Sequence, residues 1–439
     1  MSIARDARII FATRALRMFA YGLVSVVLVL YLADLGFSGQ VIGVLLTLTL
    51  LGDAGISLWL TTHADSVGRR RILVFGALLM FLAGLGFAST SWLPALVLAA
   101  TVGVVSPSGN EVGPFLAVEQ ASLSQAVPDG ARTAIFGWFN LTASFATALG
   151  ALAGGGLATG LGVAGMSPVA AYRVVIVAYA LLWLVLAGLF LRVSSAIEVP
   201  APGDAPSSRS LGLRRSRGTV GRLSALFALD AFGGGFVVQS LIAYWLHVRF
   251  GADPALIGGI LFVANVLAGV SALAAARIAD AIGLVETMVF THLPSNVLLI
   301  AVALMPTLPL AIVVLLARFS ISQMDVPARQ SYTMSVVAPD ERSAAAGVTG
   351  IARSIGASMS PLLAAPLFAS GTLASVPFVL AGGLKIGYDL LLFRGFRGTG
   401  PTRRTSAGDE HLLSGESSVD FDSAGPGSAP LPGRGRTPR

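Results

Sequence analysis

Among the ionisable residues inside long apolar stretches of the sequence, five are candidates for coupling: Asp53, Glu111, Arg318, Asp325 and Arg353. Charged groups at such positions are costly in a membrane and are usually functional. A carboxyl group in a medium of low dielectric constant favours its neutral form, so it is able to load and unload protons. We therefore expect Asp53 and Glu111 to couple proton or substrate movement. The alternative is that each is a permanently paired structural carboxylate.

Three charges share one expected helix near the end of the chain. Arg318, Asp325 and Arg329 stand at positions i, i+7 and i+11, which places them on one helix face. Arg318 is expected near the middle of the membrane, where it would meet an anionic substrate or neutralise Asp53 or Glu111. Asp325 and Arg329 are i, i+4 partners and are expected to pair.

Other polar residues of the apolar stretches receive simpler interpretations. Lys385 and Asp389 are also i, i+4 partners, and we expect them to form a structural ion pair within the last helix. Arg17 and Asp230 are expected to point into the same cavity. His292 is expected to be a packing residue or a local hydrogen-bond donor.

The composition predicts a membrane protein. Of 439 residues, 55% are hydrophobic and only 12% are charged, which is more apolar surface than a soluble protein of this length would hide. The absence of cysteine excludes disulfides and thiolate metal sites, and no helix shows a metal-ligand spacing. Lys385, the only lysine, lies outside any Gly-Lys-Ser/Thr motif, so this chain is not expected to bind ATP through a P-loop. We find no His-Glu-x-x-His motif or nucleophile–base set, and we expect neither a cofactor nor enzyme activity.

Apolar runs of about 20 residues recur along the chain, each long enough to cross a bilayer as a helix. They predict an all-α membrane protein with twelve transmembrane helices in two pseudo-symmetric six-helix bundles. The expected domains are an N-terminal bundle at residues 1–192, a cytoplasmic linker at 193–222, a C-terminal bundle at 223–394 and a disordered cytoplasmic tail at 395–439. The expected spans are residues 9–34, 40–62, 72–90, 94–125, 133–157, 168–193, 223–248, 254–279, 285–305, 307–337, 343–369 and 373–393.

The arginines predict the orientation. They gather in the N-terminus, the loop at residues 69–71, the linker and the tail, and cytoplasmic loops carry such an excess of positive charge. Both termini are therefore expected in the cytoplasm, in a multi-pass protein of the cytoplasmic (inner) membrane. The same distribution accounts for the net charge of +7 without a nucleic-acid partner.

An internal repeat joins the two halves. A polar turn is expected at residues 61–71, with Asp65, Gly68 and three arginines, and the spacing of Asp65 and Gly68 returns 215 residues later as Asp280 and Gly283. Further pairs at this offset include Gly36 with Gly251 and Gly43 with Gly258, and an offset of 210 pairs Gln120 with Gln330 and Arg132 with Arg342. Two similar halves suggest a transporter that alternates access to a central site.

The sequence resembles the major facilitator superfamily over about residues 9–394. The family's signature between helices 2 and 3 is Gly-x-x-x-Asp-Arg/Lys-x-Gly-Arg/Lys-Arg/Lys. Asp65, Gly68, Arg69 and Arg70 match it, whereas Thr61 replaces the first glycine and Ser66 replaces the basic residue after the aspartate. The resemblance implies that this stretch locks one state of the transport cycle.

By the same resemblance, a gating network is expected at the cytoplasmic ends of the helices. Its members would be Asp65, Gly68, Arg69, Arg70, Arg71 and Glu119 in the first half, and Asp280, Gly283 and Arg329, with Arg329 beside Asp280, in the second. The alternative is that the arginines are topology signals only.

Small residues in helices 5 and 11 carry a second resemblance. The family's antiporters have Gly-x-x-x-Gly-Pro-x-x-Gly-Gly in helix 5, and this chain retains only Gly150, Gly154 and Gly155 of that motif. The corresponding place in the second half has Gly356 and Pro361. Simple helix packing explains these residues equally well. The stretches 324–332 and 383–389 resemble a prokaryotic, efflux-like branch of the superfamily.

These observations predict a secondary active transporter, and the leading hypothesis is export of a small organic compound in exchange for protons. The alternative with the same fold is uptake of a nutrient, possibly an anion held by Arg318 and Arg353. A third hypothesis, from another class, is a transport-inactive membrane sensor or partner protein. The expected partners are a small-molecule substrate, protons and the lipid bilayer, and we expect a monomer.

Overall fold

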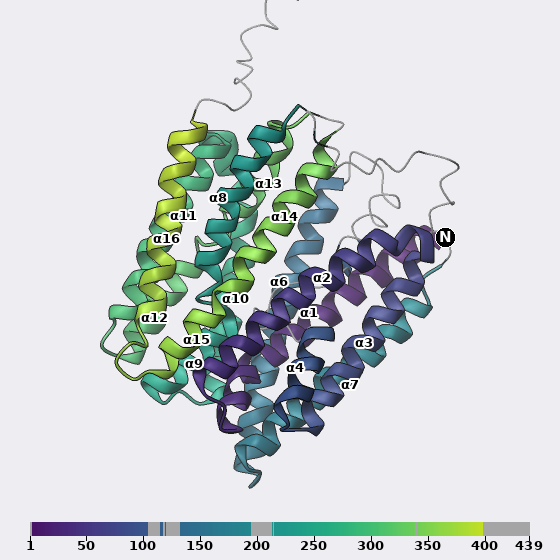
Figure 1. Ribbon diagram of the computed structural model, residues 1–439, viewed down its shortest axis with the longest axis vertical. Coiled ribbons are helices and arrows are strands. Elements are labelled where there is room, and N and C mark those ends of the chain that lie inside the picture. Colours follow the sequence, from purple (N-terminus) through teal and green to yellow (C-terminus); the bar gives the residue numbers. More distant parts are fainter. Residues whose placement is uncertain are drawn as a thin grey trace, which may run out of the picture. The chain divides into compact units, whose positions relative to one another are not determined.

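The computed structural model describes residues 2–103, 115–116, 119, 132–194, 213, 215–338 and 341–397, which belong to one compact unit. In chain order the described helices are α1 (Ser2–Asp34), α2 (Gly39–Val67), α3 (Arg69–Ser89), α4 (Leu93–Val102), α6 (Arg132–Val163), α7 (Pro168–Leu191), α8 (Arg217–Gly235), α9 (Gln239–Phe250), α10 (Pro254–Ile282), α11 (Leu284–Leu304), α12 (Leu308–Phe319), α13 (Asp325–Ser335), α14 (Arg342–Met359), α15 (Pro361–Ala369) and α16 (Val376–Phe396) (Figure 1).

The described helices fall at the places of the expected spans, and most of the fourth span, 94–125, lies outside the described residues. Among the described residues, ten helical segments are long and apolar enough to cross a membrane, and Leu93–Val102 and Leu308–Phe319 are shorter apolar helices in the fourth and tenth places. The expected tenth span is interrupted: α12 ends at Phe319 and α13 begins at Asp325. Pro327 falls in the first turn of α13, where its missing N–H costs no hydrogen bond.

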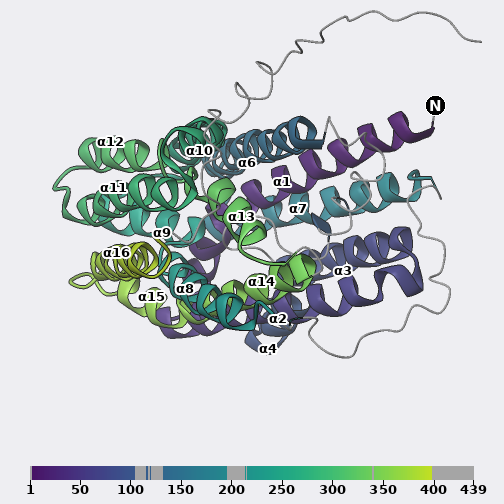
Figure 2. The same ribbon diagram turned by 90° about the horizontal axis from the view of Figure 1, so that it is seen from above.

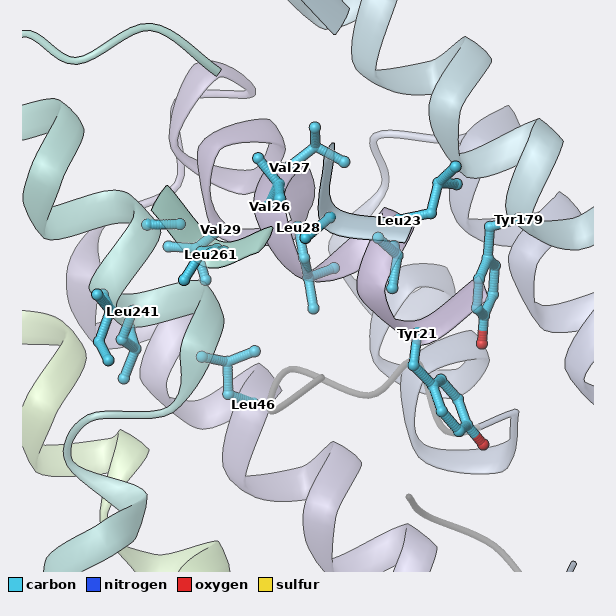
Figure 3. Close-up of a cluster of buried hydrophobic side chains, with 14 of the residues drawn as sticks. Tyr21, Leu23, Val26, Val27, Leu28, Val29, Leu46, Tyr179, Leu241 and Leu261 are labelled. Atoms are coloured by element: carbon cyan, nitrogen blue, oxygen red, sulfur yellow. The ribbon is translucent and has the colours of Figure 1, made fainter. Parts of the chain in front are cut away.

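Helix α1 lies at the centre of the first half. Every residue from 20 to 32 is buried, and a helix that is apolar on all sides is expected to be surrounded by other helices. Figure 3 shows part of this cluster, in which Tyr21, Leu23 and Leu28 of α1 lie near Leu46 of α2 and Tyr179 of α7. In the second half, α8 packs against α14 and α16, and α11 packs against α16 (Figure 2).

Backbone geometry repeats between the halves. Gly68 has φ 105° and Gly283 has φ 101°, and Gly36 and Gly251 also have positive φ. Positive φ suits glycine because it has no Cβ, so both glycine pairs found at the 215-residue offset mark the same backbone feature. The expected polar turn at residues 61–71 is wrong, because α2 continues to Val67 and Gly68 alone separates it from α3. Gly283 joins α10 to α11 in the same way.

Close helix crossings repeat as well. A Cβ at Gly22 of α1 would collide with the carbonyl oxygen of Thr147 in α6, and a Cβ at Gly235 of α8 would collide with that of Ala357 in α14. The two glycines are 213 residues apart and the two acceptors are 210 residues apart. Small residues therefore seat helix 5 against helix 1, and helix 11 against helix 7, at equivalent places.

The predicted packing residues lie at such crossings. Gly150 and Gly154 lie against the backbone of α1 at Phe19 and Leu23, and Gly356 lies against the backbone of α8 at Ala228. Gly155 instead lies against the backbone of α10 at Pro254, between the halves, and the backbone of Pro361 lies against Gly43 of α2.

The halves also share hydrogen bonds at the end where α1 finishes and α10 begins. The Gln239 side chain donates to Ser25 Oγ at 2.8 Å, and the Ala255 N–H donates to Thr159 Oγ1 at 3.0 Å. Within the second half, Asn265 donates to the same Gln239 side chain at Oε1, at 3.3 Å. Polar contacts and small residues thus join the two halves at this end of the helices.

We predict that Gly150→Ala destabilises the protein by about 1–3 kcal/mol, because the added methyl group overpacks a crossing in which backbone already contacts backbone. The measurement is the thermal unfolding midpoint of the purified protein in detergent. Gly156→Ala is the matched control in the same helix, because nothing lies within 4 Å of a Cβ built there. Equal unfolding midpoints for the two variants would contradict the prediction.

Candidate functional site

Asp230 of α8 is the centre of a buried ionic cluster. Lys385 Nζ lies 2.5 Å from Asp230 Oδ1, and the Nη1 atoms of Arg329 and Arg353 lie 3.2 and 3.1 Å from Asp230 Oδ2. His292 Nε2 is 3.7 Å from Oδ1. Helices α8, α11, α13, α14 and α16 each contribute one of these five residues. One carboxylate therefore holds together helices 7, 9, 10, 11 and 12 of the fold.

Two further carboxylates complete the cluster. Asp325 Oδ2 accepts from Arg329 at 3.0 Å, one helical turn away in α13. Asp389 of α16 contacts His292 Nδ1 at 2.8 Å and accepts from Asn296 Nδ2 at 3.0 Å. These contacts hold the His292 ring between two carboxylates.

The cluster is electrically balanced. It has three carboxylates and three permanent cations, and it is neutral when the His292 imidazole is neutral. Asp230, Asp389 and Lys385 are all buried, and Lys385 stands about midway along α16. Separating any one charge from its partners inside a bundle would leave an uncompensated charge in a medium of low dielectric constant. The balance therefore stabilises the packing of these helices.

The first half holds a smaller ionic site. Arg17 Nη1 and Nη2 donate to the two carboxylate oxygens of Glu119 at 2.8 and 2.7 Å, and Thr13 Oγ1 donates to the same carboxylate at 2.9 Å. The Arg17 guanidinium also lies 5.1 Å from the centre of the Phe115 ring. Both charged residues are buried, at 1% exposure each, so this bidentate pair is a structural element of the first half.

The two sites occupy equivalent places with the charges exchanged. Arg17 and Asp230 are 213 residues apart, and Glu119 and Arg329 are 210 residues apart, the same offsets as the glycine crossings. In the first half the cation is on the first helix of the bundle, and in the second half the anion is. The repeated backbone has thus kept an ion pair while its polarity is reversed.

The structure corrects several expected partnerships. Arg318 does not share a continuous helix face with Asp325 and Arg329, because residues 320–324 interrupt the helix, and its Nε is buried without a hydrogen-bond partner in the described structure. The pair between Lys385 and Asp389 is wrong: Lys385 binds Asp230, and Asp389 contacts His292 and Asn296. The expected pair between Asp325 and Arg329 is present.

Of the two candidate proton carriers, Asp53 is the one that the structure describes. Asp53 is half-buried in α2 and accepts from Ser57 Oγ at 2.9 Å. Glu111 lies outside the described residues. Arg353, which the sequence offers as a possible anion-binding residue, is a direct partner of Asp230.

The gating residues are placed as follows. Asp65 belongs to the last turn of α2, and its side chain lies outside the described part. Arg69 is buried, whereas Arg70 and Arg71 are exposed. Glu119 contacts Arg17 and Thr13, a partnership that sequence reasoning missed. Asp280 is exposed, and among the described residues Arg329 forms its ion pairs with Asp230 and Asp325 rather than with Asp280.

Sequence reasoning also missed the contribution of α11. His292 and Asn296 stand at i, i+4 in a mostly apolar helix, and this spacing puts both side chains on one face. This spacing could have indicated from the sequence that α11 presents a polar face to buried charged residues of other helices. Within the described residues, no group of three or more His, Asp or Glu side chains is arranged to hold a metal ion.

Repeated helix crossings and an ion pair in each half, in a chain whose described helices are long and apolar, are features of a duplicated membrane-protein fold. The chain belongs to the Major Facilitator Superfamily, which it matches over residues 10–361. The members of this family are transporters rather than enzymes.

One relative and two solved structures illustrate the likeness. An uncharacterized membrane protein of Saccharomyces cerevisiae, YJR124C, is 28% identical over 419 residues, covering 89% of this chain and 93% of the relative. A mutant form of the nucleoside transporter NupG has a TM-score of 0.72 at 12% identity, covering 89% of this chain and all of the other. A D-xylose–proton symporter has a TM-score of 0.69 at 14% identity, covering 90% and 98%. These two likenesses show the fold.

We predict that Arg17→Leu and Glu119→Leu each destabilise the protein by about 3–5 kcal/mol, because each leaves the other charge buried and unpaired. The double variant should lose much less than the sum of the two, since it removes both charges. Thermal unfolding midpoints of the four proteins in detergent form a double-mutant cycle. Additive losses would show that the two residues act independently and would contradict the pairing.

Proposed function

We propose that this protein is a proton-coupled secondary transporter of a small organic solute, in which Asp230 carries the proton. The observation that supports the proposal most directly is the buried Asp230 carboxylate, held by partners from four other helices. Protonation of this one group changes the attraction among all five helices at once. A proton carrier linked to a change of helix arrangement needs such a position.

The arrangement of the halves supports alternating access. Small residues and hydrogen bonds join them at one end, through Gly155 with Pro254 and Ser25 with Gln239. The ionic cluster lies further along the helices, about midway along α16. A rocking motion about the joined end would move the cluster relative to the first half.

The sequence leaves two directions of transport open, which are export in exchange for protons and uptake together with protons. The contacts in the structure support uptake more than export. Export in exchange for protons drew support from the small residues of helix 5, and Gly150 and Gly154 are accounted for by packing against α1. The efflux-like prokaryotic branch remains a prediction, as do the cytoplasmic position of both termini and the inner-membrane location. Uptake together with protons is the second candidate, and the Arg353–Asp230 contact favours it.

We predict that Asp230→Asn abolishes solute-driven proton movement while solute exchange persists, because asparagine preserves the shape of the side chain and cannot lose a proton. The measurement uses purified protein in liposomes that contain a pH-sensitive dye, challenged with a panel of small organic solutes. Proton entry with an added solute indicates cotransport, and proton entry in exchange for trapped solute indicates export.

Asp253→Asn is the matched control. Asp253 is an exposed residue that caps α10 through Leu256 N–H, and asparagine caps helices equally well. Solute-driven proton movement that survives in Asp230→Asn would contradict the proposed proton carrier. Solute movement that never involves protons, in the native protein as well, would contradict proton coupling. A protein that moves no solute at all would support the transport-inactive alternative.

A further inference from the structure

We propose that the transported solute is an organic anion, whose negative group binds the Arg353 guanidinium when a proton on Asp230 releases it. This inference rests on the proposed role of Asp230 as proton carrier. It commits to an anionic solute and to Arg353, which the sequence left as one alternative, and it adds the order of events. The support comes from the exposure of Arg353, its position on α14 and the charge balance of the cluster.

Arg353 is the accessible member of the cluster among the described residues. Its side chain is 35% exposed, compared with 4% for Asp230, 9% for Arg329 and 10% for Lys385. Asp230 is its ion-pair partner within the described structure. Arg353 is therefore the most exposed of the three cations that contact Asp230, while the other two are buried.

The exposed side of Arg353 does not face lipid. Ile351, Ile355 and Met359 are the exposed large apolar residues of α14, and they form a stripe at i, i+4 and i+8. At about 100° per residue, Arg353 stands roughly 200° around the helix from Ile351 and Ile355. The apolar stripe suits the hydrocarbon, so the guanidinium faces the interior side of α14, toward α8.

Protonation of Asp230 would give the cluster a positive charge. The groups that face Asp230 or its partners are Lys385, Tyr388 and Asp389 of α16, His292 of α11, Asp325 and Arg329 of α13, and Arg353 of α14. With the Asp230 carboxyl neutral, two carboxylates remain against three permanent cations. An anion bound at Arg353 restores the balance.

The charge balance of the cluster also argues against a cationic solute. A cationic solute at this site would add to the excess when Asp230 is protonated, and would meet a carboxylate that three cations already occupy when it is not. An anion and a proton therefore favour each other's binding. One proton accompanies one negative charge, which makes the process cotransport.

The test is chemical modification of Arg353 by phenylglyoxal, an arginine-selective reagent, read by peptide mass spectrometry on the purified full chain. We expect Asp230→Asn to increase modification of Arg353 several-fold over the native protein, because its carboxylate partner is gone. Asp253→Asn should leave the modification unchanged. Unchanged modification in Asp230→Asn would overturn the proposal.

The solute class is tested in the same Asp230→Asn protein. Acetate, lactate, succinate and benzoate are added in turn, each beside its own amide as the neutral match. We expect at least one anion to protect Arg353 from modification and its amide not to do so. Protection by none of the anions, or equal protection by the amides, would overturn the anionic class.

A binding measurement tests whether Arg353 binds the anion or has only a structural role. Thermal stabilisation of the native protein by the protecting anion should grow as the pH falls, should be independent of pH in Asp230→Asn, and should be lost in Arg353→Gln. If neutral or cationic solutes alone drive protons in liposomes, this inference fails while the proposed function stands. If anions protect Arg353 but Asp230→Asn leaves proton movement intact, the proposed proton carrier fails instead.

Discussion

The structure of the second half depends on one requirement, which is that a carboxylate in the middle of a helical bundle must be surrounded by cations. Asp230 meets it with Lys385, Arg329 and Arg353, and each comes from a different helix. The ion pairs are thus also the contacts that fix the relative positions of α8, α13, α14 and α16. Because the cluster as a whole is neutral, the bundle keeps it in the membrane interior without a net charge, and a single proton changes that balance.

Duplication explains where this cluster lies. Equivalent backbone crossings occur at Gly22 of α1 and Gly235 of α8. Each of these two helices also carries one partner of an ion pair: Arg17, which binds Glu119, and Asp230, which binds Arg329. The polarity is exchanged, and in the second half the pair extends to a histidine, a lysine and a second arginine. The pair in the first half is bidentate, whereas the carboxylate of the second half is shared among several cations. The two halves therefore share a backbone arrangement, but the charged residues that it holds differ between them.

Sequence reasoning recovered the features that depend on local pattern. The twelve spans follow from lengths of apolar residues, and the duplicated helix junctions follow from Gly68 and Gly283, whose backbone conformation requires glycine. The pair between Asp325 and Arg329 follows from one turn of helix. The partners of Asp230 did not follow, because Lys385, Arg353 and His292 lie far away in the sequence and meet it only when five helices assemble. The interruption at residues 320–324 also defeated the helical spacing that placed Arg318 with the others.

The ion pair at Lys385 has a consequence beyond the charge balance. This residue is the only lysine among 439, and its amino group lies 2.5 Å from Asp230 inside the bundle. Reagents and enzymes that acylate lysine therefore find their single side-chain target enclosed among helices. Acylation of Lys385 would report the opening of the cluster, in a sequence with no other lysine to obscure the signal.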